Sequence, residues 1–201
     1  MTLADGDRRL VRLFAACVLG NWYEVRALRR AAVDGEPDRR WREALLMVHV
    51  FAGFPRGVET FDVLAAVGGV GTPAPEELVE TTLDGGNELF ARIYADATDD
   101  VRRHLERHQP LFARWVLDHA YGRVLARPGL AADRRELLAC AALAVLGQDR
   151  QLASHARGAV RCGATPTEVA DVIDAVADLT SSERVDAARA IVERFARTTD
   201  G

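Results

Sequence analysis

Lysine is absent from this sequence, so all 26 residues counted as Lys+Arg are arginine. They are outnumbered by 30 acidic residues, which gives a formal net charge of −4. A chain with this balance lacks the strongly basic surface that attracts nucleic acids or anionic membranes. We therefore expect neither a nucleic acid nor a membrane as a partner.

Long apolar runs and paired cysteines are also lacking. No run approaches the roughly 18 apolar residues of a membrane-spanning helix, and the start, MTLADGDRRL, has no apolar signal-peptide core. The three cysteines, Cys17, Cys140 and Cys162, lie far apart and form no Cys-x-x-Cys motif. Such cysteines are most simply reduced thiols of the cytosol. These features predict a cytoplasmic protein.

The motifs of common cofactor sites are absent as well. There is no glycine-rich phosphate loop after a strand and no nucleophile elbow. Three of the five histidines, His104, His108 and His119, lie in a stretch rich in arginine and glutamate, without a cysteine or carboxylate at metal-ligand spacing. We expect no cofactor and no metal site.

Helical periodicity is what the sequence does contain. Apolar residues recur three and four positions apart, which is the spacing of one face of an α-helix. The run Thr165-Pro166-Thr167-Glu168 combines a capping box with proline at the first helical position. The sequence therefore predicts an all-α fold, with helical stripes at 10–18, 25–32, 41–51, 58–67, 112–125, 137–146, 152–160, 169–176 and 185–195.

Two parts of the sequence resemble each other. Residues 7–35 and 133–163 each begin with Asp-Arg-Arg, continue into an alanine-rich helix that ends in Leu-Gly, and finish with a second helix before glycine. This parallel indicates a duplicated helical unit. A glycine- and proline-rich stretch divides the copies. We predict an N-terminal half-repeat lobe at 1–69, a connector at 70–86 and a C-terminal lobe at 87–201.

A series of short motifs lies between Tyr121 and Asp171: Tyr121-Gly122, Arg127-Pro128-Gly129-Leu130, Arg135-Glu136-Leu137-Leu138, Leu146-Gly147, Gln151-Leu152, His155, Gly163-Ala164-Thr165-Pro166, Glu168-Val169 and Asp171. Their order and spacing resemble the carboxymuconolactone decarboxylase family. In the N-terminal lobe, the segment 51–55 (FAGFP) resembles the Tyr-Ala-Gly-x-Pro segment of that family. The resemblance implies an all-α helical bundle of the alkylhydroperoxidase D-like type, assembled as a homo-oligomer, either a trimer or a hexamer.

The two lobes lack complementary parts of this family pattern. In the C-terminal lobe, Leu179-Thr180-Ser181 stands where Tyr-Ala-Gly is expected. In the N-terminal lobe, the positions that match Glu136 and His155 fall near Arg9 and Leu28. One composite site built from both lobes and a fold that has lost its chemistry are both consistent with this loss.

Glu136 and His155 match the acidic and histidine positions of alkylhydroperoxidase D relatives, whose motif is Glu, Cys-x-x-Cys, His. The two cysteine positions of that motif are Gln148 and Gln151 here. Without a peroxidatic and a resolving thiol, the disulfide cycle of those relatives cannot run. The resemblance is therefore closer to the decarboxylase branch.

Spacing also places Glu136 and His155 near each other. They lie eleven residues before and eight residues after Gly147, or roughly 16 and 12 Å from this turn along antiparallel helices. His155 is then a proton donor or acceptor whose tautomer Glu136 sets, or the two form a buried pair that only satisfies polar groups. Cys140, one turn after Glu136, is a candidate redox thiol or a small buried hydrophobe.

Arg127 and Arg135 flank the start of the helix that carries Glu136. A decarboxylase that acts on a carboxylated lactone needs a cation for the substrate oxygens and an acid that returns a proton after carbon dioxide leaves. Arg127 or Arg135 with His155 fit these roles, or the arginines form only ion pairs. His49 is a candidate substrate-binding residue from the N-terminal lobe, or a core histidine.

Three hypotheses for function follow. The leading one is a small-molecule lyase or related proton-transfer enzyme of the carboxymuconolactone decarboxylase type, acting on a carboxylated lactone-type substrate. The second is an alkylhydroperoxidase or peroxiredoxin-type antioxidant activity that uses Cys140 as a lone thiol. The third is a non-catalytic binding or scaffold protein with the same fold.

Overall fold

Helices build the described part of the protein, which comprises residues 2–80 and 83–197 of the computed structural model. Within these ranges there is no β-strand, so the predicted all-α fold is confirmed. The first half contains α1 (Asp5–Leu19), α2 (Trp22–Arg30), α3 (Arg39–Ala52), α4 (Phe54–Ala65) and the 3-10 helix η1 (Pro75–Leu78).

The second half begins with α5 (Leu83–Tyr94), the 3-10 helix η2 (Ala95–Ala97), α6 (Thr98–His108), α7 (Pro110–Trp115) and the π-helix η3 (Val116–Leu125). It ends with α8 (Ala132–Leu146), α9 (Asp149–Cys162), α10 (Pro166–Ala175), the 3-10 helix η4 (Ala177–Leu179) and α11 (Ser182–Phe195). Among the described residues, no helix is both long and apolar enough to cross a membrane.

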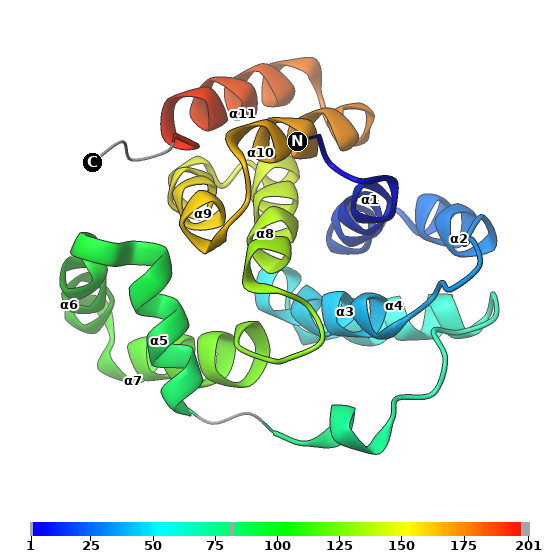
Figure 1. The fold of residues 1–201 in the computed structure, drawn as a ribbon, viewed down its shortest axis with the longest axis horizontal. Helices are drawn as coiled ribbons and strands as arrows, with labels where there is room; N and C mark the ends of the chain where they lie inside the picture. The colour runs from blue at the N-terminus through cyan, green and yellow to red at the C-terminus, as the bar shows by residue number, and fades with distance from the viewer. Residues whose placement is uncertain (1, 81–82, 198–201) are drawn as a thin grey trace.

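Helix α8 lies at the centre of the molecule, with α1 and α9 beside it (Figure 1). It also contacts α3 and α10. Every residue from Arg135 to Val145 is buried, because this stretch is almost entirely apolar or small and therefore packs on all sides. The two charged residues at its start, Arg135 and Glu136, are carried into the interior with it.

The two predicted copies share their local geometry. Helices α1 and α8 each have 15 residues, and their N-cap residues Ala4 and Ala131 have the same dihedral angles, φ −64° and ψ 151°. Each helix ends at a glycine in the left-handed region, Gly20 with φ 72° and Gly147 with φ 71°. A residue without Cβ adopts this conformation at little cost. This match favours the duplication, while the domain boundaries stay a prediction.

The predicted connector is partly helical. It contains the 3-10 helix η1, and α5 then begins at Leu83, inside the range expected to link the lobes. Gly85 and Gly86 lie within α5 instead of breaking it. A Cβ on Gly86 would lie 2.5 Å from the Cα of Gly122, so Gly86 allows α5 and η3 to approach closely.

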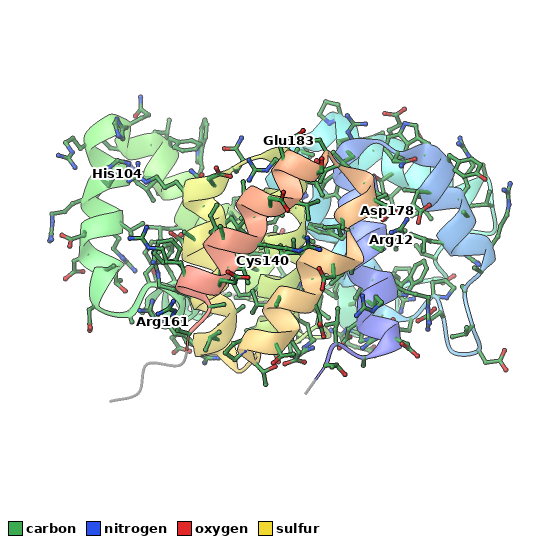
Figure 2. The ribbon with its side chains drawn as sticks, turned by 90° about the horizontal axis from the view of Figure 1, so that it is seen from above. Arg12, His104, Cys140, Arg161, Asp178 and Glu183 are labelled. Atoms are coloured by element: carbon green, nitrogen blue, oxygen red, sulfur yellow. The ribbon has the colours of Figure 1, made fainter. Side chains whose placement is uncertain are left out.

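Ion pairs join α1 to helices of the second half. Arg134 on α8 binds Asp7 on α1 at 3.0 Å and Glu168 on α10 at 2.8 Å. Arg12 and Asp178 also pair, and Figure 2 shows them together at the same side of the molecule. The Asp-Arg-Arg start of α8 thus serves, through Arg134, to connect helices within the chain.

Candidate active site

A large cavity lies between the end of α3 and the helices of the second half. Its volume is about 1270 Å³, and its walls come from α3, α4, α5, α6, α7, η3 and the start of α9. Aromatic side chains form much of the wall, and Phe54, Phe112 and Trp115 are exposed where they line it. Ligand cavities are typically about 300–1,000 Å³ in volume, so an organic molecule of moderate size fits here.

His155 lies at the α9 wall of this cavity and is held by Glu136. Its Nδ1 is 2.9 Å from Oε2 of Glu136, and the two residues are 8% and 1% exposed. The structure thus brings together the two residues whose spacing from the Gly147 turn predicts proximity. Phe51 adds an edge-on aromatic contact, with ring centroids 6.3 Å apart.

Gly158 makes room for the Glu136 carboxylate. It follows His155 by three residues on α9, so both face α8. A Cβ on Gly158 would lie 2.6 Å from Oε2 of Glu136 and 2.8 Å from Cγ2 of Ile93. The missing side chain is therefore part of the site, because it lets the carboxylate reach the imidazole.

The charge of Glu136 sets the protonation of His155. Burial by itself lowers the pKa of His155, but the negative charge and the hydrogen bond of Glu136 outweigh burial and raise this pKa above its usual value. The Nδ1–H donates to the carboxylate, so Nε2 is the nitrogen left for a ligand in the cavity. The arrangement therefore favours the protonated form of His155 more than an isolated imidazole would.

Two tyrosines from neighbouring helices line the same cavity. The hydroxyl groups of Tyr94 on α5 and Tyr121 on η3 lie 3.2 Å apart. Burial raises the pKa of Tyr94 and raises that of Tyr121 well above its usual value. Both therefore remain neutral O–H donors at physiological pH. The sequence singled out Tyr121 only as a family motif and gave no signal for Tyr94.

His49 also lines the cavity, as the composite-site hypothesis requires. Its Nε2 lies 2.8 Å from Nε2 of His119, and its ring stacks on Phe54 with centroids 4.5 Å apart. The sequence gives no signal for this contact, and the spacing around His119 bears only on metal binding. Among the described residues, no cluster of three or more potential ligands is placed to hold a metal ion.

Arg127 and Arg135 lie apart from the cavity and bind a different carboxylate. Both reach Glu43 on α3: Nη2 of Arg135 lies 2.9 Å and Nε of Arg127 3.0 Å from its Oε2. Glu43 and Arg135 are each 1% exposed. Neither arginine lines the cavity, so the structure does not bring these substrate-binding candidates together with His155. It uses them to tie the loop before α8 to α3.

Cys140 is buried in the middle of the molecule (Figure 2). Burial and the nearby charge of Glu136 raise the pKa of this thiol well above its usual value. The thiolate is the reactive form of cysteine, so these surroundings keep Cys140 unreactive. Gln151, at one of the two missing cysteine positions, is exposed and lines the cavity.

The second half of the chain, which contains His119, Glu136 and His155, matches a known family. The model described as the carboxymuconolactone decarboxylase family matches residues 110–194. This part of the chain is therefore similar to the carboxymuconolactone decarboxylase family. The match confirms the resemblance inferred from the motifs, and the helical fold agrees with it. The match begins at Pro110, after α6, so α3 and α5 contribute cavity walls from outside the matched range.

A curated relative extends the similarity beyond this domain. The protein is 29% identical over 135 residues to "Peroxisomal protein 2" of Schizosaccharomyces pombe. The similarity covers 64% of this chain and 62% of the relative, so the chain spans less than two thirds of that protein's length. The relative's name states a location and no reaction.

Proposed function

We propose that this protein is a small-molecule lyase or proton-transfer enzyme that acts on a carboxylated lactone-type compound. The observation that carries the proposal is the Glu136–His155 pair at the wall of a cavity. A histidine whose Nδ1 is held by a carboxylate and whose Nε2 faces a ligand is suited to general acid catalysis. The family of residues 110–194 supports the substrate class.

In the proposed reaction, carbon dioxide leaves the bound substrate and the electron pair of the broken C–C bond delocalises into a conjugated carbonyl. Protonated His155 then delivers its Nε2 proton to the substrate, and Glu136 stabilises the imidazolium before this transfer. The hydroxyl group of Tyr94, which accepts a hydrogen bond from that of Tyr121, keeps its own O–H as a donor for an oxygen that gains negative charge. Arg127 and Arg135 stabilise the structure around the site through Glu43 and do not contact the substrate.

Replacement of His155 tests this function. Carboxymuconolactone is incubated with the wild-type protein, His155→Gln and the matched control His108→Gln, and its loss is followed by ultraviolet absorbance. We expect turnover by the wild type and by His108→Gln, and a rate about 10²- to 10⁴-fold lower for His155→Gln. Equal rates for all three proteins would refute the role of His155. If the wild type does not turn over carboxymuconolactone, this compound is excluded as the substrate.

The two other hypotheses receive less support. The lone-thiol activity requires an accessible thiolate, whereas Cys140 is buried and its pKa is raised. A non-catalytic scaffold would be favoured if Glu136 and His155 were sealed from solvent with no cavity beside them. His155 instead lines a cavity of about 1270 Å³.

We also propose that the protein is a homo-oligomer, a trimer or a hexamer. Helix α4 exposes Phe54, Val58 and Phe61, which follow one another at helical spacing and therefore form one apolar face. A lasting interface buries more than about 1,000 Å² in total, and such a face supplies its apolar centre. Light scattering at micromolar concentration checks this proposal, and a mass near the 22.0 kDa of one chain would contradict it.

We further propose a cytoplasmic protein whose duplicated lobes, 1–69 and 87–201, act as one unit across the connector 70–86. The reduced, unpaired cysteines support the location, and the matched ends of α1 and α8 support the duplication. Cell fractionation tests the location, and recovery in a peroxisomal fraction, as the name of the yeast relative suggests, would contradict it.

A further inference from the structure

One end of the cavity carries charges that the proposed reaction does not use. They come from α6 and the start of α9, and the residues are Asp100, Arg103, Glu106, Arg107 and Arg150. Asp100 pairs with Arg103. Within residues 2–80 and 83–197, neither Arg107 nor Arg150 forms an ion pair. Two arginines are thus left against one acidic residue, Glu106, so this end of the cavity has an excess of positive charge.

Both arginines remain available to a ligand. Arg107 and Arg150 are exposed, and none of the residues of α6 is buried. Asp149, the acidic neighbour of Arg150 in sequence, binds Arg184 of α11. Its charge is therefore used elsewhere in the fold. A guanidinium group has five N–H donors and favours a carboxylate or phosphate as partner.

His104 shows that the two arginines act on the same part of the cavity. It lies on α6 at the edge of the molecule (Figure 2) and lines the cavity. Partial burial lowers its pKa, and the positive charges of Arg150, His108 and Arg107 lower it further. Arg150 comes from α9 and Arg107 from α6, so charges from two helices converge here. Such convergence in a cleft attracts an anion.

Arg150 lies on the same side of α9 as His155. The residues of α9 that line the cavity are Arg150, Gln151, Ser154 and His155. Arg150 precedes His155 by five positions, or roughly 7.5 Å along the helix axis. Its long side chain leans toward the start of the helix, away from the histidine. A ligand that contacts both groups must therefore be elongated.

Aromatic side chains provide an apolar wall for the middle of such a ligand. Phe51 contacts His155 at one end. Phe112 and Trp115 also line the cavity, and they belong to α7, which packs against α6 at the other end. Both rings are at least half exposed, so an apolar ligand would cover surface that now faces solvent. The cavity volume of about 1270 Å³ leaves room for this larger molecule.

The group held by the arginines differs from the carboxylate that is lost. The lost carboxylate belongs to the part of the substrate that His155 protonates. A cation beside it would stabilise the bound carboxylate more than the transition state, in which its charge moves into the substrate, and would slow the reaction. His155 has Phe51 as a neighbour, whereas Arg150 lies further along α9. The positions of the two arginines therefore suit an anionic group that stays on the product.

We propose that Arg107 and Arg150 form the subsite for a second anionic group of the substrate, a carboxylate or a phosphate, which the reaction retains. The substrate is an elongated acid, with its reacting end at His155, its apolar middle on the aromatic wall and its anionic end at the two arginines. This inference rests on the proposed function and narrows its substrate class. It gives Arg107 and Arg150 the substrate-binding role expected for Arg127 and Arg135, which do not line the cavity.

Calorimetric titration of the full chain tests the subsite without any reaction. The probe is ω-phenylhexanoate, which has a carboxylate on a long apolar chain, and ω-phenylhexanamide is its neutral counterpart. We expect the wild type to bind the carboxylate about 10-fold more tightly than the amide. Arg107→Gln and Arg150→Gln should each remove most of this preference. Arg114→Gln is the matched control, because Arg114 is an exposed arginine of α7 that does not line the cavity, and it should keep the preference.

Two results of this titration would overturn the proposal. One is equal binding of carboxylate and amide by the wild type, and the other is an equal loss of preference in Arg114→Gln and Arg150→Gln. A further arm, ω-phenylhexyl phosphate, distinguishes the two anions. Tighter binding of the phosphate supports a phosphate ester as substrate, and tighter binding of ω-phenylhexanoate supports a carboxylic acid.

Histidine NMR provides a readout at both ends of the ligand. A bound carboxylate offsets the charges of Arg107 and Arg150, so the titration midpoint of His104 should rise with ω-phenylhexanoate and stay unchanged with the amide. The same probe should also shift the His155 signal, because it is long enough to reach that end. Phenylacetate, which has the same ring and charge on a short chain, should shift the signal of His104 alone. An unchanged His104 midpoint with ω-phenylhexanoate would contradict the subsite.

The subsite and the proposed reaction can fail separately. His155→Gln should bind ω-phenylhexanoate as the wild type does, because binding requires no proton transfer. If the arginine-dependent preference is found but the wild type does not decarboxylate carboxymuconolactone, the subsite stands and the reaction on this compound is refuted. If carboxymuconolactone is decarboxylated but Arg150→Gln keeps the full preference for the carboxylate probe, the reaction stands and the subsite is refuted.

Discussion

Replacing Gly158 by alanine should disturb the site from within while keeping α9 intact. The new Cβ would lie 2.6 Å from Oε2 of Glu136 and 2.8 Å from Cγ2 of Ile93. Such distances are shorter than real carbon contacts, so the carboxylate must move. Overpacking of this kind costs about 1–3 kcal/mol. Alanine gains up to about 1 kcal/mol over glycine in a helix, so the net loss of stability is about 0–2 kcal/mol.

Gly85→Ala is the matched control for this substitution. Gly85 also lies in a helix, α5, but a Cβ there would lie 3.7 Å from the Cβ of Ala126, which is an ordinary contact. The difference between the unfolding free energies of the two variants therefore isolates the clash, at about 1–3 kcal/mol. Urea unfolding followed by circular dichroism measures this difference.

The pKa of His155, measured by NMR titration, provides a second test of the Gly158→Ala prediction. If Glu136 moves away, its charge no longer raises the pKa of His155 and burial continues to lower it. The NMR titration midpoint of His155 should therefore fall in Gly158→Ala and stay unchanged in Gly85→Ala. Equal stability of the two variants together with an unchanged His155 titration would refute the reasoning.

Three further predictions concern stability and reactivity. Glu43→Gln leaves the buried charge of Arg135 and its neighbour Arg127 without their carboxylate, so thermal unfolding should show a loss of about 3–5 kcal/mol, and an unchanged melting temperature would contradict this. The pKa of His155 is raised in the folded state. The protonated imidazole therefore stabilises the fold fully below the pKa of the unfolded chain, about 6.5, and this stabilisation is lost as pH rises through the pKa of the folded state. The difference in unfolding free energy between wild type and His155→Gln should accordingly shrink from pH 5.5 to pH 8.5. Cys140→Ala should keep the fold and leave hydroperoxide consumption unchanged, because this thiol is buried, and slower consumption would indicate a lone-thiol peroxidase.

The local parts of the site were predictable from sequence, and the long-range parts were not. Glu136 and His155 lie on two helices joined by one glycine turn, so their distances from Gly147 sufficed to place them together. Arg127 and Arg135 bind Glu43 across 84 and 92 residues. No local pattern encodes that pairing, and the same arginines fit a substrate-binding role equally well from sequence alone.

His119 lies in a helix of unusual geometry. It lies in η3, which is π-helical over ten residues from Val116 to Leu125. A π-helix has more residues per turn than an α-helix. Its side chains therefore lie on other faces than the α-helical period predicts. Extended π-helical stretches are rare and often occur at functional sites. His119 contacts His49 across 70 residues of sequence, so no local pattern encodes this contact either.

The complementary losses of the two lobes are consistent with a single composite cavity. The N-terminal part keeps the junction of α3 and α4, with His49, Phe51 and Phe54 on the cavity wall. The C-terminal part keeps the Glu136–His155 pair. More than half of the cavity-lining residues precede residue 110 and so lie outside the range that matches the carboxymuconolactone decarboxylase family. The Glu136–His155 pair therefore lies inside the range that matches the family, whereas much of the opposite wall comes from residues outside that range. A screen of candidate substrates should therefore vary the part of the small molecule that would contact the wall opposite His155.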